Sequence, residues 1–125
     1  MSIRIVDHIN IATPRLEETR RFYVDVLGLR EGYRPASIAV EGYWLYAGER
    51  PIVHMQTTER DVVASTASAL NHFAFDVDDL DALVARLERA DYPFRRVDVA
   101  GTRIRQAFLE DPAGVRLELN ENPDR

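Results

Sequence analysis

Four side chains that can bind a divalent metal occur as two pairs with the same spacing. His8 lies 64 positions before His72, and His54 lies 64 positions before Glu118. The chain has three histidines and contains no cysteine or lysine, so imidazole and carboxylate groups are the main candidates for metal ligands. The same composition excludes cysteine nucleophiles, zinc–thiolate sites and Schiff-base chemistry on lysine. The sequence therefore favours a metal site with nitrogen and oxygen ligands.

Length and charge narrow the class of protein further. The chain has 125 residues, of which 46% are hydrophobic and 30% charged, which is typical of one compact domain or two very small fused units. The formal net charge of −5 argues against a nucleic-acid partner. No window approaches the roughly 20 apolar residues of a membrane helix, and the N-terminus has no signal-peptide stretch. We therefore expect no membrane partner and a cytoplasmic location.

A first series of short elements contains His8 and His54. Residues that alternate in polarity predict strands, helical spacing predicts a helix, and glycine or proline marks the ends. The expected elements are a strand over 3–12, a helix from Thr13-Pro14 to Gly28, strands near 30–34, 40–46 and 51–56, and a hairpin turn at 47–50. This order is βαβββ.

The same order begins again after a polar connector. The expected elements are a strand over 71–77, a helix capped by Asp78 and ended by Tyr92-Pro93, strands near 94–99, 103–109 and 115–120, and a turn at 111–114. We therefore predict an α+β fold in a single domain over 1–125, with one module over about 1–56, a linker over 57–70 and a second module over about 71–122.

Strand alternation places the four metal-type side chains on one kind of face. Leu117 and Leu119 are apolar and should face the helix, so Glu118 between them should face away from it, and the same parity holds for the histidines. Each of the four lies on the first or last strand of its series. A curved sheet that brings those strands together would gather them around one point.

Further residues are candidates for substrate contact or catalysis. Gln56 lies two residues after His54, on the same face of the strand, and is the alternative fourth ligand. Trp44 is a candidate pocket residue, although core packing is its alternative, and Arg34 and Arg105 could receive an anionic substrate group unless they are solvated surface charges. Glu118 is the only acidic residue among the four, which makes it the candidate catalytic base.

These segments resemble the vicinal oxygen chelate superfamily, which includes glyoxalase I, methylmalonyl-CoA epimerase, extradiol dioxygenases, and fosfomycin and bleomycin resistance proteins. Its most specific part is an Asp-Pro-x-Gly turn that leads into an apolar-Glu-apolar strand. The segments that show the resemblance are 7–9, 22–29, 71–75 and 108–119. The resemblance implies two tandem βαβββ modules that form a U-shaped mixed sheet around a divalent metal. It also implies a ligand set that matches, position by position, His8, His54, His72 and Glu118.

The resemblance also implies a function and leaves alternatives open. The leading hypothesis is a lyase or isomerase of glyoxalase type, in which Zn, Ni, Mn, Co or Fe polarises a small substrate chelated through two neighbouring oxygens and Glu118 acts as ligand and base. Glyoxalase I has a glutamate at the position of His54, so this chain departs from it there. One alternative is a non-haem Fe(II) dioxygenase that uses His8, His72 and Glu118. The other is an antibiotic-resistance protein, either a thiol transferase for fosfomycin or a bleomycin binder.

A homodimer is expected by the same resemblance. The sequence leaves open the substrate, the metal, whether one centre takes its ligands from one chain or two, and whether His54 or Gln56 is the fourth ligand.

Overall fold

The computed structural model describes residues 2–125 and divides into two units, one ending at Val62 and the other beginning at Val63. Each unit contains one four-stranded mixed sheet and one main helix, so the predicted α+β class is confirmed. No helix in the described part of the chain is long and apolar enough to cross a membrane.

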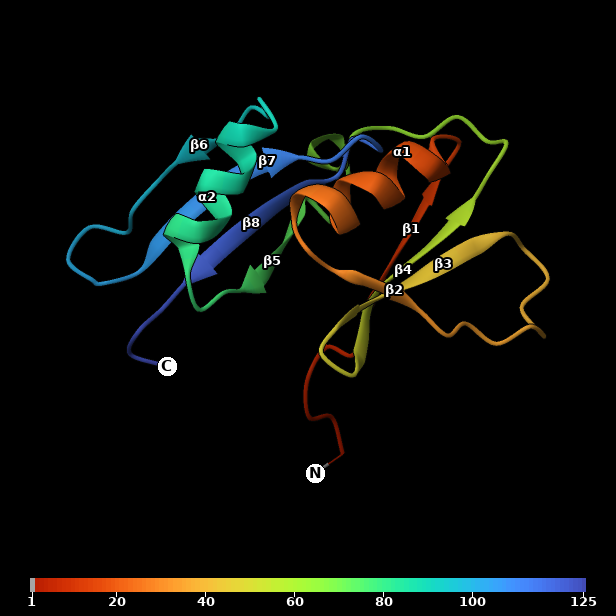
Figure 1. Cartoon of the computed structure of the whole chain (residues 1–125), viewed down its shortest axis with the longest axis horizontal. Coiled ribbons are helices and arrows are strands. Elements are labelled where there is room, and N and C mark those ends of the chain that lie inside the picture. The colour runs from red at the N-terminus through yellow and green to blue at the C-terminus, as the bar shows by residue number, and fades with distance from the viewer. Residues whose placement is uncertain (1) are drawn as a thin grey trace. The chain divides into compact units, whose positions relative to one another are not determined.

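The first unit pairs its first strand with its last. Its sheet has the order β1-β4-β3-β2, in which β1 and β4 are parallel and the other neighbours are antiparallel. One face of this sheet is covered by α1 (Figure 1). Tyr23, Leu45 and Val53 are fully buried in the core of the unit. The elements are β1 (Ile9–Thr13), α1 (Leu16–Arg21), the π-helical segment η1 (Phe22–Val26), β2 (Arg30–Gly32), β3 (Gly42–Ala47) and β4 (Arg50–Thr57).

The second unit has the same construction. Its sheet has the order β5-β8-β7-β6, again with the first and last strands parallel. The helix α2 lies across one face of this sheet (Figure 1). Leu80, Leu87 and Leu117 are fully buried in its core. The elements are the short 3-10 helix η2 (Ser65–Ala67), β5 (His72–Asp76), α2 (Leu80–Arg89), β6 (Arg95–Arg96), β7 (Arg105–Glu110) and β8 (Arg116–Glu121).

The 64-residue spacing also appears in the backbone pairing. In the first unit Ile9 is paired with Val53, and in the second Phe73 is paired with Leu117, each partner shifted by 64 positions. The two strand pairs, β1 with β4 and β5 with β8, thus have equivalent registers although their sequences differ. Since a one-residue slip would move every side chain to the opposite face, this register determines which residues can meet.

The N-terminal strand is shorter than predicted. Alternation indicated a strand over 3–12, but β1 begins at Ile9 and leaves His8 just before it. The parallel pairing with β4 starts only at Val53, although β4 itself begins at Arg50, and Pro51 of β4 has no backbone N–H to donate to a ladder. Ile3 and Ile5 precede this ladder, and their side chains are exposed.

Both helix starts also differ from the prediction by one or two residues. Thr13 is the last residue of β1, and α1 begins at Leu16; the Thr13 hydroxyl accepts a hydrogen bond from the backbone N–H of Arg15 at 3.0 Å. In α2 the N-cap is Asp79, not Asp78. Its carboxylate accepts the backbone N–H of the third residue of the helix at 3.0 Å, which satisfies one of the unpaired donors there.

The end of α2 is also earlier than predicted. The helix ends at Arg89, and Asp91 adopts a left-handed conformation with φ 52°, so the chain has already left the helix before Tyr92-Pro93.

The turn between β7 and β8 is formed as the sequence indicated. Asp111 is 5% exposed, and its Oδ1 accepts hydrogen bonds from the backbone N–H groups of Ala113 and Val115, each at 2.9 Å. Gly114 has φ 87°, which other residues rarely adopt. The turn therefore defines where β8 begins, and with it the position of Glu118.

Removing the Asp111 carboxylate should destabilise the second unit. We expect Asp111→Ala to lower the free energy of unfolding by about 1–3 kcal/mol, because two partly buried backbone donors lose their acceptor. Asp111→Asn retains an acceptor oxygen and should lose less. Urea denaturation followed by circular dichroism measures both, with Glu49→Ala in the turn of the first unit as a surface control. An Asp111→Ala protein as stable as the wild type would contradict this account of the turn.

Candidate metal centre

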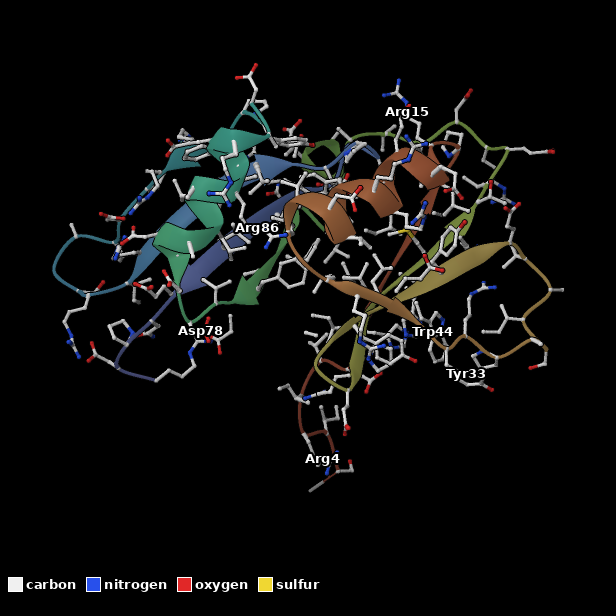
Figure 2. All side chains as sticks on the ribbon, viewed as in Figure 1. Arg4, Arg15, Tyr33, Trp44, Asp78 and Arg86 are labelled. Carbon is white, nitrogen blue, oxygen red and sulfur yellow. The ribbon has the colours of Figure 1, made fainter. Side chains whose placement is uncertain are left out.

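In the first unit His54 is held between two other rings. It lies on β4 opposite Trp44 of β3, and the two ring centroids are 4.1 Å apart with 13° between the planes. The ring of His8 stacks on His54 with a centroid distance of 3.7 Å and an angle of 11°. Figure 2 shows Trp44 on the side of the sheet away from α1. The three rings therefore fix the plane of the central imidazole.

The Nε2 atom of His54 has no partner in this stack. It is buried and forms no hydrogen bond with any described residue. Burying an imidazole nitrogen without a hydrogen-bond partner costs free energy. In a neutral imidazole such a nitrogen can carry the lone pair that binds a metal.

His8 is oriented by its neighbour in the sequence. Its Nδ1 lies 2.7 Å from Oδ2 of Asp7, and its side chain is 39% exposed. A carboxylate on one ring nitrogen sets the tautomer and the ring plane and leaves the other nitrogen for a metal, as is common around metal-bound histidines.

The second unit contains the corresponding pair. The Nε2 atom of His72 lies 3.3 Å from Oε2 of Glu118. The Nδ1 atom of His72 lies 2.9 Å from Oδ1 of Asn71, so this ring too is held from the preceding residue. Asn71 lies 64 positions after Asp7. The repeat therefore includes the residues that orient both histidines, and the sequence prediction missed this although the spacing shows it.

Two amides fix the carboxylate of Glu118. Its Oε1 accepts hydrogen bonds from Nε2 of Gln106 at 2.5 Å and from Nδ2 of Asn120 at 2.7 Å, and its side chain is 9% exposed. These donors make burial of the charge tolerable and commit one oxygen, so Oε2 is the atom that faces His72. The sequence prediction assigned neither amide a role; strand alternation does place both on the face of Glu118.

The remaining candidates lie in different surroundings. Gln56 is on the face of β4 that carries His54, but its Oε1 accepts a hydrogen bond from Nδ2 of Asn10 at 3.0 Å. Arg105 forms ion pairs with Asp81 and Glu121, and its alternation in β7 puts it on the face opposite Gln106. A role for Gln56 or Arg105 in substrate binding stays a prediction, and Arg34 is considered below.

The surroundings of His54 favour the neutral imidazole. Burial lowers its pKa below the usual 6.5, and the positive charges of His8 and, more weakly, Arg34 lower it further. A backbone hydrogen bond with Pro51 and the charge of Asp7 act in the opposite direction without reversing the shift. A neutral ring can act as a metal ligand without first losing a proton.

The residues present fit a divalent cation. The set offers imidazole nitrogens with fixed rings and one buried carboxylate oxygen, which suit Zn, Ni, Mn, Co or Fe. Within neither unit does a third histidine or carboxylate from the described residues complete a metal-binding group. Each unit thus carries half of the predicted ligand set.

The comparisons with known proteins agree with the fold. A sequence model of the Glyoxalase/Bleomycin resistance protein/Dioxygenase superfamily matches residues 5–119. The chain therefore belongs to that superfamily.

Individual relatives cover nearly the whole chain. It is 34% identical to the uncharacterized protein YaeR of Escherichia coli over an alignment of 128 positions, which covers 97% of this chain and 98% of YaeR. It is 27% identical over 120 positions to glyoxylase I 4 of Arabidopsis thaliana, covering 91% of this chain and 68% of the relative. A solved structure of a glyoxalase family protein from Bacillus anthracis superposes with a TM-score of 0.78 at 26% identity, covering 98% of each chain.

The depressed pKa of His54 can be measured directly. In the metal-free protein we expect its imidazole to titrate below pH 6.5, and His8→Ala to raise the midpoint, because that change removes a like charge and exposes the ring. Long-range ¹H–¹⁵N NMR of the histidine rings resolves the three titrations.

The sign for stability follows from the same shift. The folded state binds a proton on the His54 ring less tightly than the unfolded state does. The contribution of His54 to the free energy of unfolding is therefore fully present above pH 6.5 and is lost as the pH falls through the midpoint of the folded state. A midpoint at or above 6.5 in the metal-free wild type would show that the stack does not desolvate the ring.

Proposed function

We propose that this protein is a divalent-metal-dependent lyase or isomerase of glyoxalase type. It acts on a small substrate that chelates the metal through two neighbouring oxygens, with His8, His54, His72 and Glu118 as ligands. Superfamily membership supports the class of protein. Two observations, one from each unit, support the ligand residues: Nε2 of His72 lies 3.3 Å from a Glu118 oxygen in the second unit, and Nε2 of His54 in the first unit is buried with no hydrogen-bond partner among the described residues.

The bound metal would supply Lewis acidity, which stabilises negative charge on a chelated substrate oxygen and so acidifies the neighbouring C–H bond. In this proposal Glu118 takes that proton. Its Oε1 is fixed by two amide donors, so Oε2, the oxygen that faces His72, is the atom left to serve as ligand and base, and its direction is set before substrate arrives. Burial of this side chain keeps bulk water from competing for the proton.

The histidines have a different task. His8 and His72 are each held through Nδ1 by the preceding side chain, which leaves Nε2 as the ligating atom of both rings. His54 is held by stacking on both faces. Their preset orientation limits the entropy lost on metal binding.

Replacement of Glu118 tests this function. We expect Glu118→Gln to lower turnover by at least about 100-fold on a glyoxalase substrate such as a hemithioacetal, because general-base catalysis contributes on that order. Glu110→Gln, on the same hairpin and exposed, is the control and should leave turnover unchanged. The assay is run across a panel of hemithioacetals, acyl-CoA thioesters, catechols and fosfomycin, after the metal has been restored. Full activity of Glu118→Gln would remove Glu118 from the mechanism.

Metal analysis separates this function from the alternatives. Purified protein should bind one of Zn, Ni, Mn, Co or Fe, and His54→Ala should weaken that affinity. Bound Fe together with oxygen consumption on catechols would replace the proposal with a dioxygenase. Turnover of fosfomycin with a thiol would replace it with a resistance enzyme, and a wild-type protein with no affinity for any of these metals would rule out all three.

We also propose that the protein acts as a homodimer. Two units that each hold half a ligand set can be completed within one chain or by exchange between two chains. The two arrangements predict different outcomes when inactive variants are mixed.

In the mixing experiment, His54→Ala and Glu118→Gln proteins are combined after mild unfolding. If the ligands come from two chains, each mixed dimer contains one intact site, and activity should return to about a quarter of the wild-type value after random exchange. If they come from one chain, both sites of a mixed dimer remain damaged and no activity returns. Size-exclusion chromatography checks the dimer itself, and a monomeric active protein would contradict it.

A further inference from the structure

Arg34 is a partly buried arginine beside the ring stack of the first unit. It follows β2 at the start of the loop that leads to β3, where the carbonyl of Tyr33 accepts a hydrogen bond from the Tyr46 hydroxyl at 2.6 Å. This bond ties the loop to β3 at the residue next to Arg34. The backbone that carries the Arg34 side chain is therefore anchored to β3.

The guanidinium lies close to Gly42, at a point that the backbone oxygen of Met55 approaches more closely still. Its Nη2 lies 2.9 Å from the point where a Cβ on Gly42 would be. Gly42 is two residues before Trp44 in β3, so both positions belong to the same face of the strand. The positive charge of Arg34 also contributes to the lowered pKa of His54, which places the two groups within electrostatic reach.

Within the part of the chain that the structure describes, Arg34 has no counterion. Its Nε is buried without a hydrogen-bond partner, and no described residue forms an ion pair with its side chain. Other arginines in the chain have carboxylate partners: Arg20 is paired with Glu17 at 3.0 Å and Arg116 with Glu110 at 3.6 Å. A partly desolvated guanidinium without an anion is unfavourable, and an oxyanion at its terminal nitrogens would offset that cost.

We propose that Arg34 is a specificity-determining residue that binds an oxyanionic group, a carboxylate or a phosphonate, on the substrate that occupies the face of Trp44 and His54. The planar guanidinium can form two parallel hydrogen bonds to either group. This assignment rests on the proposed function insofar as it places the anion on the same small substrate. The anion subsite itself consists only of residues of the first unit and does not require the metal.

The single tryptophan reports binding at this position. Trp44 is the only tryptophan in the chain and stacks on His54, so its fluorescence responds to a ligand beside the stack. The full-length, metal-free protein is titrated with malonate, phosphonoacetate and the neutral analogue malonamide. We expect malonate, phosphonoacetate or both to give a saturable change, and malonamide to give none. The stronger of the two anions identifies the preferred group.

Substitution then assigns the effect to Arg34. Arg34→Gln should weaken binding of the preferred anion by about tenfold or more, since it removes a charged hydrogen-bonding pair, and Arg34→Lys should give an intermediate loss. Arg60→Gln, in the polar connector, is the matched control and should bind like the wild type. Circular dichroism verifies that each variant is folded, and if Arg34→Gln does not fold, the comparison of anion with malonamide in the wild type decides.

Three results would overturn the assignment: equal binding of malonate and malonamide, undiminished anion binding by folded Arg34→Gln, or no saturable response in the wild type. Failure of the proposed function has a different signature. Co²⁺ binding, followed by its visible absorption, should be retained in Arg34→Gln. A wild-type protein that binds the anion but no Co²⁺ would keep this subsite and reject the metal-dependent function.

Discussion

The parallel pairing of the first and last strands in each unit is the constraint on which the candidate site depends. A parallel pair cannot be joined by a tight turn, so a helix and two further strands must separate β1 from β4 and β5 from β8. Residues more than forty positions apart become neighbours in this way. In β5 and β8, Ala74 is paired with Glu118, and His72 is one pleat away on the same face, which brings imidazole and carboxylate within 3.3 Å. No local element could produce this contact.

The strand faces and the register could be predicted because they follow from a period of two. The 64-residue spacing of four metal-type residues indicated that two strand pairs share one register, and the pairings of Ile9 with Val53 and Phe73 with Leu117 show that register. Element ends could not be predicted as well. The start of β1 is the point where its parallel pairing with β4 begins, which is a tertiary contact. Asp78 and Asp79 are both suitable cap residues by type, and the structure uses Asp79.

The positions of the candidate ligands were predictable, but their hydrogen bonds were not. Which atom of Glu118 is free depends on the side-chain conformations of Gln106 and Asn120, and alternation alone says only that the three share a face. The hydrogen-bond partners of the His8 and His72 rings could be inferred more readily from the sequence. Asp7 and Asn71 immediately precede the two histidines, and their common spacing repeats that of the ligands.

The two units stabilise their buried candidate ligands, His54 and Glu118, by different physical means, and this difference is consistent with a histidine at position 54. A buried carboxylate needs donors, and Glu118 receives one of them from Gln106 on the neighbouring strand. The position equivalent to Gln106 in the first unit is Gly42, which has no amide to offer and beside which the Arg34 guanidinium lies. A neutral imidazole does not need such a donor, because stacking between His8 and Trp44 covers both of its faces. A histidine at position 54 is therefore consistent with the donors and rings that its own unit supplies, and the positive charge of Arg34 remains available for an anion from outside the chain.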